Sequence, residues 1–225
     1  MQAVVREFVS DGVRAAMPHP EAHVVVRFVG DGLDLHAIGA REHVHRKFVR
    51  AGLRIAMVRL PLGSAESVLG ASAAALAGRV VPLEELWGRD AIELRDRLAR
   101  APANAGTLVE QAIAARAAAP RSTLALAAAA EQLAHARVRD VARGFGLSQR
   151  QFRRVFRDAV GLSPKSFARL ARFHRAVDAA RRGASWTRIA AATGYCDQAH
   201  LIDEFHAITS TTPRQFMTEL TDSLA

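Results

Sequence analysis

The 225-residue sequence has little cysteine and no long apolar run. A single cysteine, Cys196, leaves no partner for an internal disulfide, which fits a chain kept in a reducing compartment. No stretch approaches the ~18 consecutive apolar residues of a membrane-spanning helix. The first residues lack the basic start and apolar core of a signal peptide. We therefore expect a cytoplasmic protein with no membrane partner.

The sequence also lacks the motifs of common enzyme chemistry. It contains no glycine-rich phosphate loop and no nucleophile elbow. Glu84 and Glu85 are adjacent, so on a helix they point in different directions and form a poor acid–base pair. Cys196 lies in a predicted turn, where a small structural side chain is a simpler interpretation than a nucleophile. We predict that the chain is not an enzyme and holds no cofactor.

Three histidines form the only metal-site candidate that the sequence suggests. His43 and His45 would share one face of a strand, with His36 near them, and imidazole is a common metal ligand. No cysteine or carboxylate pattern accompanies them. Hydrogen-bonded or exposed histidines are therefore the better interpretation, and we predict no metal site.

Positive charge is concentrated in one part of the chain. The net charge is +9, of which residues 1–120 carry +2 and residues 121–225 carry +7. Residues 137–182 contain 13 basic and 3 acidic side chains, whereas residues 183–225 have a net charge of −3. A membrane-surface patch would need large apolar residues beside these charges, but the phenylalanines lie at core spacing. A local positive stripe instead indicates a surface that faces a polyanion.

Residues 138–157, VRDVARGFGLSQRQFRRVFR, predict a helix-turn-helix. Gly146 allows a tight turn, and Ser148 with Gln151 three residues later forms a capping box for the second helix. An ordinary helix with a solvated arginine face would explain the charge, but not the turn glycine and the capped helix behind it. The spacing i, i+3, i+4 predicts one buried stripe, Phe152, Val155 and Phe156.

The helix-turn-helix recurs in the C-terminal half. A helix over residues 164–182 connects the two copies, with Ser163 as its N-cap and Gly183 at its C-terminal end. An internal duplication of this kind is more specific than either copy alone. The matching residues, 48 or 49 positions apart, are Ala142 and Ala190, Gly146 and Gly194, Phe156 and Phe205, Pro164 and Pro213, and Phe167 and Phe216.

The N-terminal half has a mixed pattern. Valine- and phenylalanine-rich segments predict about five strands, too few for an eight-stranded jelly roll, and the last two are expected to form a hairpin around Ala51-Gly52. Short helices are expected after Ser64, and alanine-rich helices on either side of Pro120. The predicted fold class is α+β: a small β-rich and helical domain over residues 1–119, then an all-α domain over 120–225. The predicted strands cover residues 4–9, 23–29, 33–38, 46–50 and 53–60.

The C-terminal half resembles the DNA-binding domain of AraC-type (arabinose regulator) transcription regulators. The resemblance is carried by DVARGFGLSQRQFRRVFRDAVGLSPKSFARL and by IAAATGYCDQAHLIDEF with the following TTPRQF. It implies a double helix-turn-helix domain that binds duplex DNA, with a variable effector or dimerisation domain at the other end. The N-terminal half is similar to a small uncharacterised sensor-like domain found on some of these regulators, through VHRKFVRAGLRIAMVRLPLG and GRVVPLEELWG. The resemblance therefore does not imply a sugar ligand.

The second copy departs from that pattern. Many relatives place a basic residue near position 203 or 206, where this chain has Asp203, Glu204 and His206. The two carboxylates either lie near the polyanion or point at the arginines of the first copy and hold the copies together. Ser210 also replaces the glycine that the first copy has at Gly161.

The predicted DNA contacts are therefore unequal. Arg150 and Arg153 are expected at base edges, and Gln149 at adenine. Arg154, Arg157 and Lys165 are expected to hold phosphates, and Gln198 and His200 are the base-facing candidates of the second copy. The complete set of predicted DNA-binding residues is Ser148, Gln149, Arg150, Arg153, Arg154, Arg157, Lys165, Gln198 and His200.

The sequence thus predicts a sequence-specific transcription regulator of the cytoplasm, associated with the nucleoid when DNA-bound. The first copy is expected to dominate. Candidate partners besides double-stranded DNA are RNA polymerase, an unknown small-molecule effector and a second copy of the chain. One rival is a protein-interaction module built on a degenerate helix-turn-helix pair. A second is a DNA-repair fusion with a reactive cysteine, for which Cys196 in a turn is a poor candidate.

Overall fold

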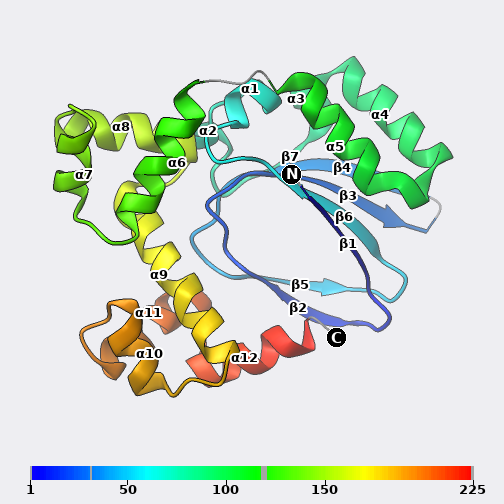
Figure 1. Cartoon of the computed structure of the whole chain (residues 1–225). Helices are drawn as coiled ribbons and strands as arrows, with labels where there is room; N and C mark the ends of the chain where they lie inside the picture. The colour runs from blue at the N-terminus through cyan, green and yellow to red at the C-terminus, as the bar shows by residue number, and fades with distance from the viewer. Residues whose placement is uncertain (1, 31, 118–120, 224–225) are drawn as a thin grey trace.

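A computed structural model describes residues 2–30, 32–117 and 121–223 (Figure 1). The N-terminal half is β-rich with helices on one side, and the C-terminal half is helical, as the sequence predicts. The predicted fold class is therefore confirmed. The expected linker at Pro120 lies outside the described residues.

The main sheet has five antiparallel strands in the order β1-β6-β3-β4-β7. Val24 and Val26 of β3 and Val58 of β6 point to one face and are completely buried, because helices cover that face. Two of the predicted strands, 23–29 and 33–38, correspond to β3 and β4, which pair antiparallel with each other. The strand bounds are Ala3–Glu7 for β1, His23–Val29 for β3, Gly32–Ile38 for β4, Arg54–Arg59 for β6 and Val80–Pro82 for β7.

A second sheet pairs β2 (Gly12–Ala16) with β5 (His45–Val49). The described residues thus contain seven strands, not five, since β2 and β7 are short and carry no clear alternation. The predicted hairpin around Ala51-Gly52 is wrong. A turn is present there, but β5 pairs with β2 whereas β6 pairs with β1 and β3, so the turn connects two sheets.

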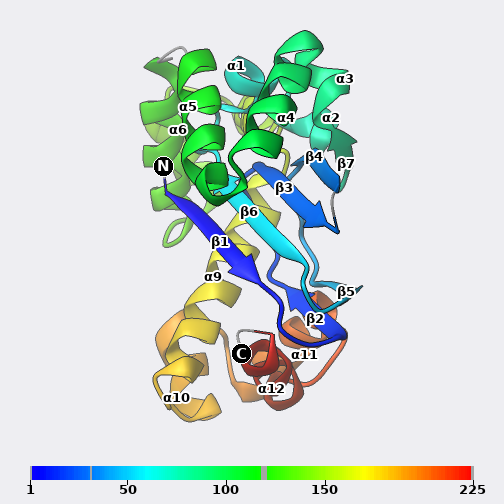
Figure 2. The same cartoon turned by 90° about the vertical axis from the view of Figure 1, so that its right-hand side faces the viewer.

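Helices α4 and α5 lie across the main sheet (Figure 2). Leu94 and Leu98 of α4 and Val109 and Ile113 of α5 are buried against it. The indole of Trp87 donates to the Val68 carbonyl at 2.9 Å, so this buried ring leaves no unpaired donor. The helix bounds are Ala65–Leu69 for α1, Ala73–Leu76 for α2, Leu83–Trp87 for α3, Arg89–Arg100 for α4 and Ala105–Arg116 for α5.

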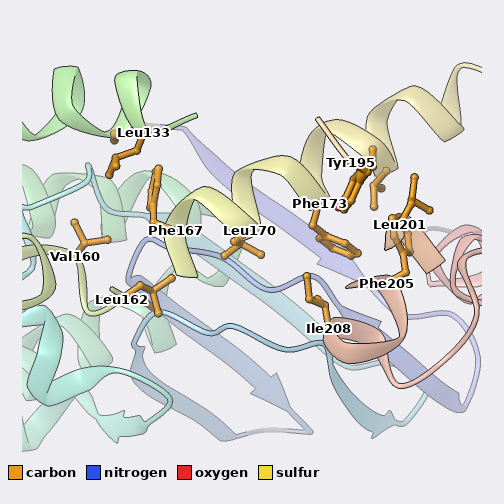
Figure 3. Packing of buried hydrophobic residues seen from close by; sticks show 14 of the residues in the cluster. Leu133, Val160, Leu162, Phe167, Leu170, Phe173, Tyr195, Leu201, Phe205 and Ile208 are labelled. Carbon is orange, nitrogen blue, oxygen red and sulfur yellow. The ribbon is translucent and has the colours of Figure 1, made fainter. Parts of the chain in front are cut away.

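The C-terminal region is organised around one long helix, α9 (Pro164–Arg181). Phe167 at its start packs in the first helix-turn-helix, and Phe173 lies against Phe205 of the second, with ring centroids 4.8 Å apart (Figure 3). One continuous core therefore joins the copies. The remaining helices are α6 (Arg121–Leu133), α7 (Val138–Gly144), α8 (Gln149–Val160), α10 (Trp186–Thr193), α11 (Gln198–Thr209) and α12 (Pro213–Asp222).

The N-terminal region contacts both copies. Ala40 is buried in the core of the C-terminal region, and α2 packs against α8. At the other end, the Val44 N–H donates to the Ile208 carbonyl at 3.0 Å, and the Arg46 guanidinium pairs with Glu219 at 2.8 Å. The two regions are thus packed on each other along α9.

Candidate nucleic-acid interface

The first copy consists of α7, a tight turn and α8. Gly146 has φ +66°, the left-handed conformation that its place in the turn requires. The Ser148 hydroxyl accepts the Gln151 N–H at 3.3 Å, and Gln151 Oε1 accepts the Ser148 N–H at 3.1 Å. The predicted capping box is therefore confirmed, and it fixes the point at which α8 begins.

Helix α8 buries one face and exposes a basic one. Phe152, Phe156 and Val160 are buried at i, i+4, i+8. Val155 was predicted in this stripe and is instead 47% exposed, because the core contacts only one flank of the helix and Val155 lies beyond it. The exposed side chains of α8 include Gln149, Arg150, Arg153, Arg154 and Arg157.

These arginines have no ion-pair partner among the residues that the structure describes. Among the described residues, no carboxylate lies within 4.0 Å of the guanidinium of any of them. Lys165, in the first turn of α9, is also exposed and is equally without an ion-pair partner in the described part of the chain. Five cations therefore lie on or next to a helix with a fixed start, which suits phosphates and guanine edges.

The second copy consists of α10, a turn at Gly194 with φ +85°, and α11. Asp197 caps α11 by accepting the His200 N–H at 2.8 Å. The Gln198 Oε1 accepts the Thr187 hydroxyl at 2.8 Å, which ties this exposed amide to α10. His200 is half-buried, and its Nδ1 accepts the Cys196 N–H at 3.3 Å, so this ring also supports the turn.

The carboxylates of α11 have different roles. Glu204 is half-buried and pairs with Arg169 of α9 at 3.0 Å and with Arg172 at 3.9 Å. Arg172 also donates to the Gly194 carbonyl at 3.2 Å and lies over the Tyr195 ring. Glu204 therefore ties α11 to the connecting helix and not to the arginines of the first recognition helix. Asp203 is exposed.

The basic residues of the stretch 137–182 thus fall into two groups in the structure, those that make internal contacts and those that face outward. Arg169, Arg172 and Arg175 of α9 point at Glu204, the Gly194 carbonyl and the Ala134 carbonyl, so they serve internal contacts. The exposed arginines of α8 form no such contact with the described residues. A count of charge along the sequence could not make this distinction, because it depends on which way each side chain of α9 points.

A histidine cluster that the sequence did not reveal lies where α9 meets the N-terminal region. The rings of His19 and His23 are 5.2 Å apart, those of His19 and His174 are 5.6 Å apart, and His174 Nε2 lies 2.7 Å from the Pro18 carbonyl. Burial lowers the pKa of His19 to about 3 and that of His23 to about 4, with Arg59 nearby acting in the same direction. Burial also lowers the pKa of His174. All three rings are therefore held neutral near pH 7.

The histidines considered as metal ligands lie elsewhere. His43 precedes β5, in which His45 is the first residue, so the expected sharing of a strand face is wrong. His36 lies on β4 with Nδ1 3.5 Å from Nη2 of Arg27. Within the described residues, no group of three or more histidine, cysteine or acidic side chains could hold a metal ion.

One cavity bears on the expected small-molecule effector. A cavity between the N-terminal region and α8, lined by residues that include Leu62, Ala73 and Val160, has a volume of about 10 Å³, which matches a single water molecule. It is too small for a metabolite.

In residues 2–30, 32–117 and 121–223, no helix combines the length and the apolarity needed to cross a bilayer.

Comparison with protein families matched residues 141–219, from α7 to α12, to a helix-turn-helix domain family. The match covers less than half of the chain, and it confirms the resemblance of this segment to the AraC-type domain. A comparison with curated proteins found no match.

Among solved structures, the chain is similar to ToxT from Vibrio cholerae, with a TM-score of 0.49, 8% identity and 98% of each chain covered. ToxT from Vibrio cholerae O395 gives a TM-score of 0.48 and 7% identity, again over 98% of each chain. Wild-type ToxT from strain SCE256 with bound unsaturated fatty acid gives 0.48 and 8%, over 98% of this chain and 95% of that one. Likeness at this level assigns no ligand to this chain.

Proposed function

We propose that this chain is a sequence-specific, DNA-binding transcription regulator in which α8 enters a major groove. The observation that carries the proposal is the row of five exposed cations, without ion-pair partners in the described part of the chain, on and beside a capped helix of the first helix-turn-helix. The family match of residues 141–219 supports the same class of function. A protein-interaction module would use the same fold, but it has no need of unpaired cations on the outer face of α8.

We assign each predicted DNA-binding residue a role according to its position on its helix. Arg150 and Arg153 lie in the first half of α8, the part of a recognition helix that meets base edges, and Gln149 at the first position is suited to adenine. Arg154, Arg157 and Lys165 are suited to phosphates. Ser148 acts by holding the start of the helix. Gln198 and His200 remain the candidates of the second copy, within the limits of their contacts to Thr187 and Cys196.

We assign DNA binding to residues 120–225 and an effector or dimerisation role to residues 1–119. The separate cores of the sheet region and the helical region support this division, although Ala40 belongs to the second core. RNA polymerase, a small-molecule effector and a second copy of the chain stay predictions. We also propose that the chain works in the cytoplasm, at the nucleoid when DNA-bound.

The test is the salt dependence of binding to duplexes selected by the protein from a random library. Each neutralised phosphate adds about −0.9 to the slope of log K against log salt, so five cations give a slope of about −4.5. Arg157→Gln should reduce the slope by about 1. The matched control is Arg89→Gln, because Arg89 is an exposed arginine of α4 in the N-terminal region.

Two results would reject the proposal. The first is that no duplex is selected. The second is a flat salt response with protein partners captured instead, which would favour the interaction module. Retention of the α-helical circular dichroism spectrum in Arg157→Gln is needed for the comparison, and the exposure of that side chain makes it the expected result.

A further inference from the structure

The two recognition helices correspond residue by residue. Helices α8 and α11 each contain 12 residues and begin directly after a capping residue, Ser148 or Asp197. The buried Phe152 and Phe156 of α8 correspond to Leu201 and Phe205 of α11, each 49 positions later. The same shift of 49 therefore identifies the outward-facing positions of α11 that match the base-facing positions of α8.

In this register, the two recognition helices carry different residue types at their matching outward-facing positions. Where α8 carries Arg150 and Arg153, α11 carries Ala199 and Ile202. Both are exposed, and Ile202 retains 37% of its surface although it is a large apolar side chain. In the helices from α6 to α12, the large apolar side chains that are described as exposed are Val155 and Ile202. The second recognition helix thus presents an apolar pair where the first presents two cations.

The surroundings of this pair argue against a phosphate contact. Asp203 is exposed next to Ile202, and a carboxylate repels the backbone of a nucleic acid. Gln198, one turn before, is held in place by Thr187. An apolar side chain in the major groove finds only one apolar group on a base edge, the C5-methyl group of thymine.

We propose that Ala199 and Ile202 contact thymine methyl groups, so that the second copy selects a thymine-containing half-site whereas the first copy selects guanine. This inference rests on the proposed function, since it needs α11 in a major groove. It goes beyond that function because it states which base the second copy prefers and through which atoms.

The experiment replaces thymine by deoxyuridine, which removes the methyl group and leaves every hydrogen-bonding atom. Duplexes selected from the random library are synthesised with single replacements along both half-sites, and binding is measured by gel shift. Loss of one buried methyl contact should weaken binding by roughly fourfold. The loss should occur in one half-site only. At the thymine that Ile202 contacts, Ile202→Ala should bind the thymine and deoxyuridine duplexes equally, whereas a thymine that Ala199 contacts should keep its sensitivity.

The matched control is Val155→Ala, which truncates the exposed apolar side chain of the other recognition helix. By the register, Val155 corresponds to Glu204 and not to an outward position, so this variant should keep the full sensitivity to deoxyuridine. Ile202 is exposed, so its truncation should leave the unfolding midpoint nearly unchanged.

Three outcomes would overturn the inference. Equal binding of wild type to thymine and deoxyuridine duplexes would do so and leave the proposed function intact. Undiminished sensitivity to deoxyuridine at every position of the half-site in Ile202→Ala would remove Ile202 from the proposed contacts. Failure to bind any duplex would remove the proposed function itself, and this inference with it.

Discussion

The two helix-turn-helix copies share their interior and differ on their outer faces. Phe156 and Phe205 are both almost completely buried, and each recognition helix begins at a side-chain cap. On the outer faces, α8 carries arginines that form no ion pair with any described residue, whereas α11 has Asp203 exposed and Glu204 paired with Arg169. A duplicated fold thus keeps the positions that pack and varies the positions that meet a partner, which is why the copies are expected to differ in what they bind.

The copies also differ in how the N-terminal region holds them. Helix α2 approaches the first copy closely, since a Cβ atom added at Gly161 would lie 2.7 Å from the Ala73 carbonyl oxygen. The second copy is held by the hydrogen bond from Val44, directly before β5, to Ile208, and by the ion pair of Arg46 in β5 with Glu219. The first contact is backbone packing and the second is polar, so substitutions should separate them.

The largest expected effect tests the shared interior. Phe156→Ala and Phe205→Ala should each lower the free energy of unfolding by about 3–5 kcal/mol, because each removes a fully buried ring. Urea unfolding followed by circular dichroism measures both losses. Val155→Ala serves as the exposed control. Losses that differ by several kcal/mol would show that the two interiors are not equivalent.

The next effect tests the outer faces. Arg150→Ala or Arg153→Ala should each weaken binding to the selected duplex by about 1–3 kcal/mol and relax the preference at one base pair. Gln198→Ala should weaken binding less, because the Gln198 amide is hydrogen-bonded to Thr187 and α11 also exposes the Asp203 carboxylate. Gel shifts with all three variants on one duplex measure the order. A greater loss from Gln198→Ala than from either arginine variant would reverse the assignment of the dominant copy.

Much of the C-terminal region could be predicted from the sequence, because its signals are local. Caps at Ser148 and Ser163 and the turn at Gly146 depend on residues three or four positions apart, and the structure confirms each of them. Repetition at a constant distance then revealed the second copy. Local signals also predicted strands over 23–29 and 33–38, which the structure contains as β3 and β4.

The remaining features depend on contacts between distant residues. The pairing of β5 with β2 is set by tertiary packing, and no local pattern separates it from the expected hairpin with β6. Glu204 lies on a recognition helix, yet its role is decided by Arg169, 35 positions earlier in the chain. The cluster of His19, His23 and His174 combines two segments that have no sequence pattern in common.

That cluster predicts a pH dependence of the contact that holds α9 and the N-terminal region together. The pKa of His19 is about 3 and that of His23 about 4 in the folded chain, against about 6.5 for an exposed histidine. Between these values the unfolded chain binds protons that the folded chain does not. Stability should therefore fall as the pH is lowered from about 6.5 to 4, by up to about 1.4 kcal/mol per pH unit for each histidine.

Urea unfolding at pH 7, 6 and 5 measures this slope. Arg41, Arg59, Glu21 and Asp178 also face the cluster, so replacement of the histidines is needed to assign the effect. The double variant His19→Asn, His23→Asn should have a flatter pH profile. His206→Asn, at an exposed position of α11, should keep the original slope. An unchanged slope in the double variant would exclude these rings as its cause.

The smallest effects concern the helix ends, where the copies differ by one residue type. Gly161 ends α8 with φ +85°, and Ser210 ends α11 in the same left-handed region with φ +59°. Side chains other than glycine are strained there, so Ser210→Gly should stabilise the chain by up to about 1 kcal/mol. Gly161→Ser should destabilise it by more than that, because the added Cβ also meets the Ala73 carbonyl.

Gly183 separates the two causes of the loss at Gly161. It has φ +81° and open space where its Cβ atom would lie, so Gly183→Ser introduces the backbone strain alone. The additional loss in Gly161→Ser then measures the close approach of α2 to the first copy. Urea unfolding of the three variants gives this difference. Equal losses at the two glycines would mean that α2 yields without cost, and the N-terminal region would then hold the first copy no more tightly than the second.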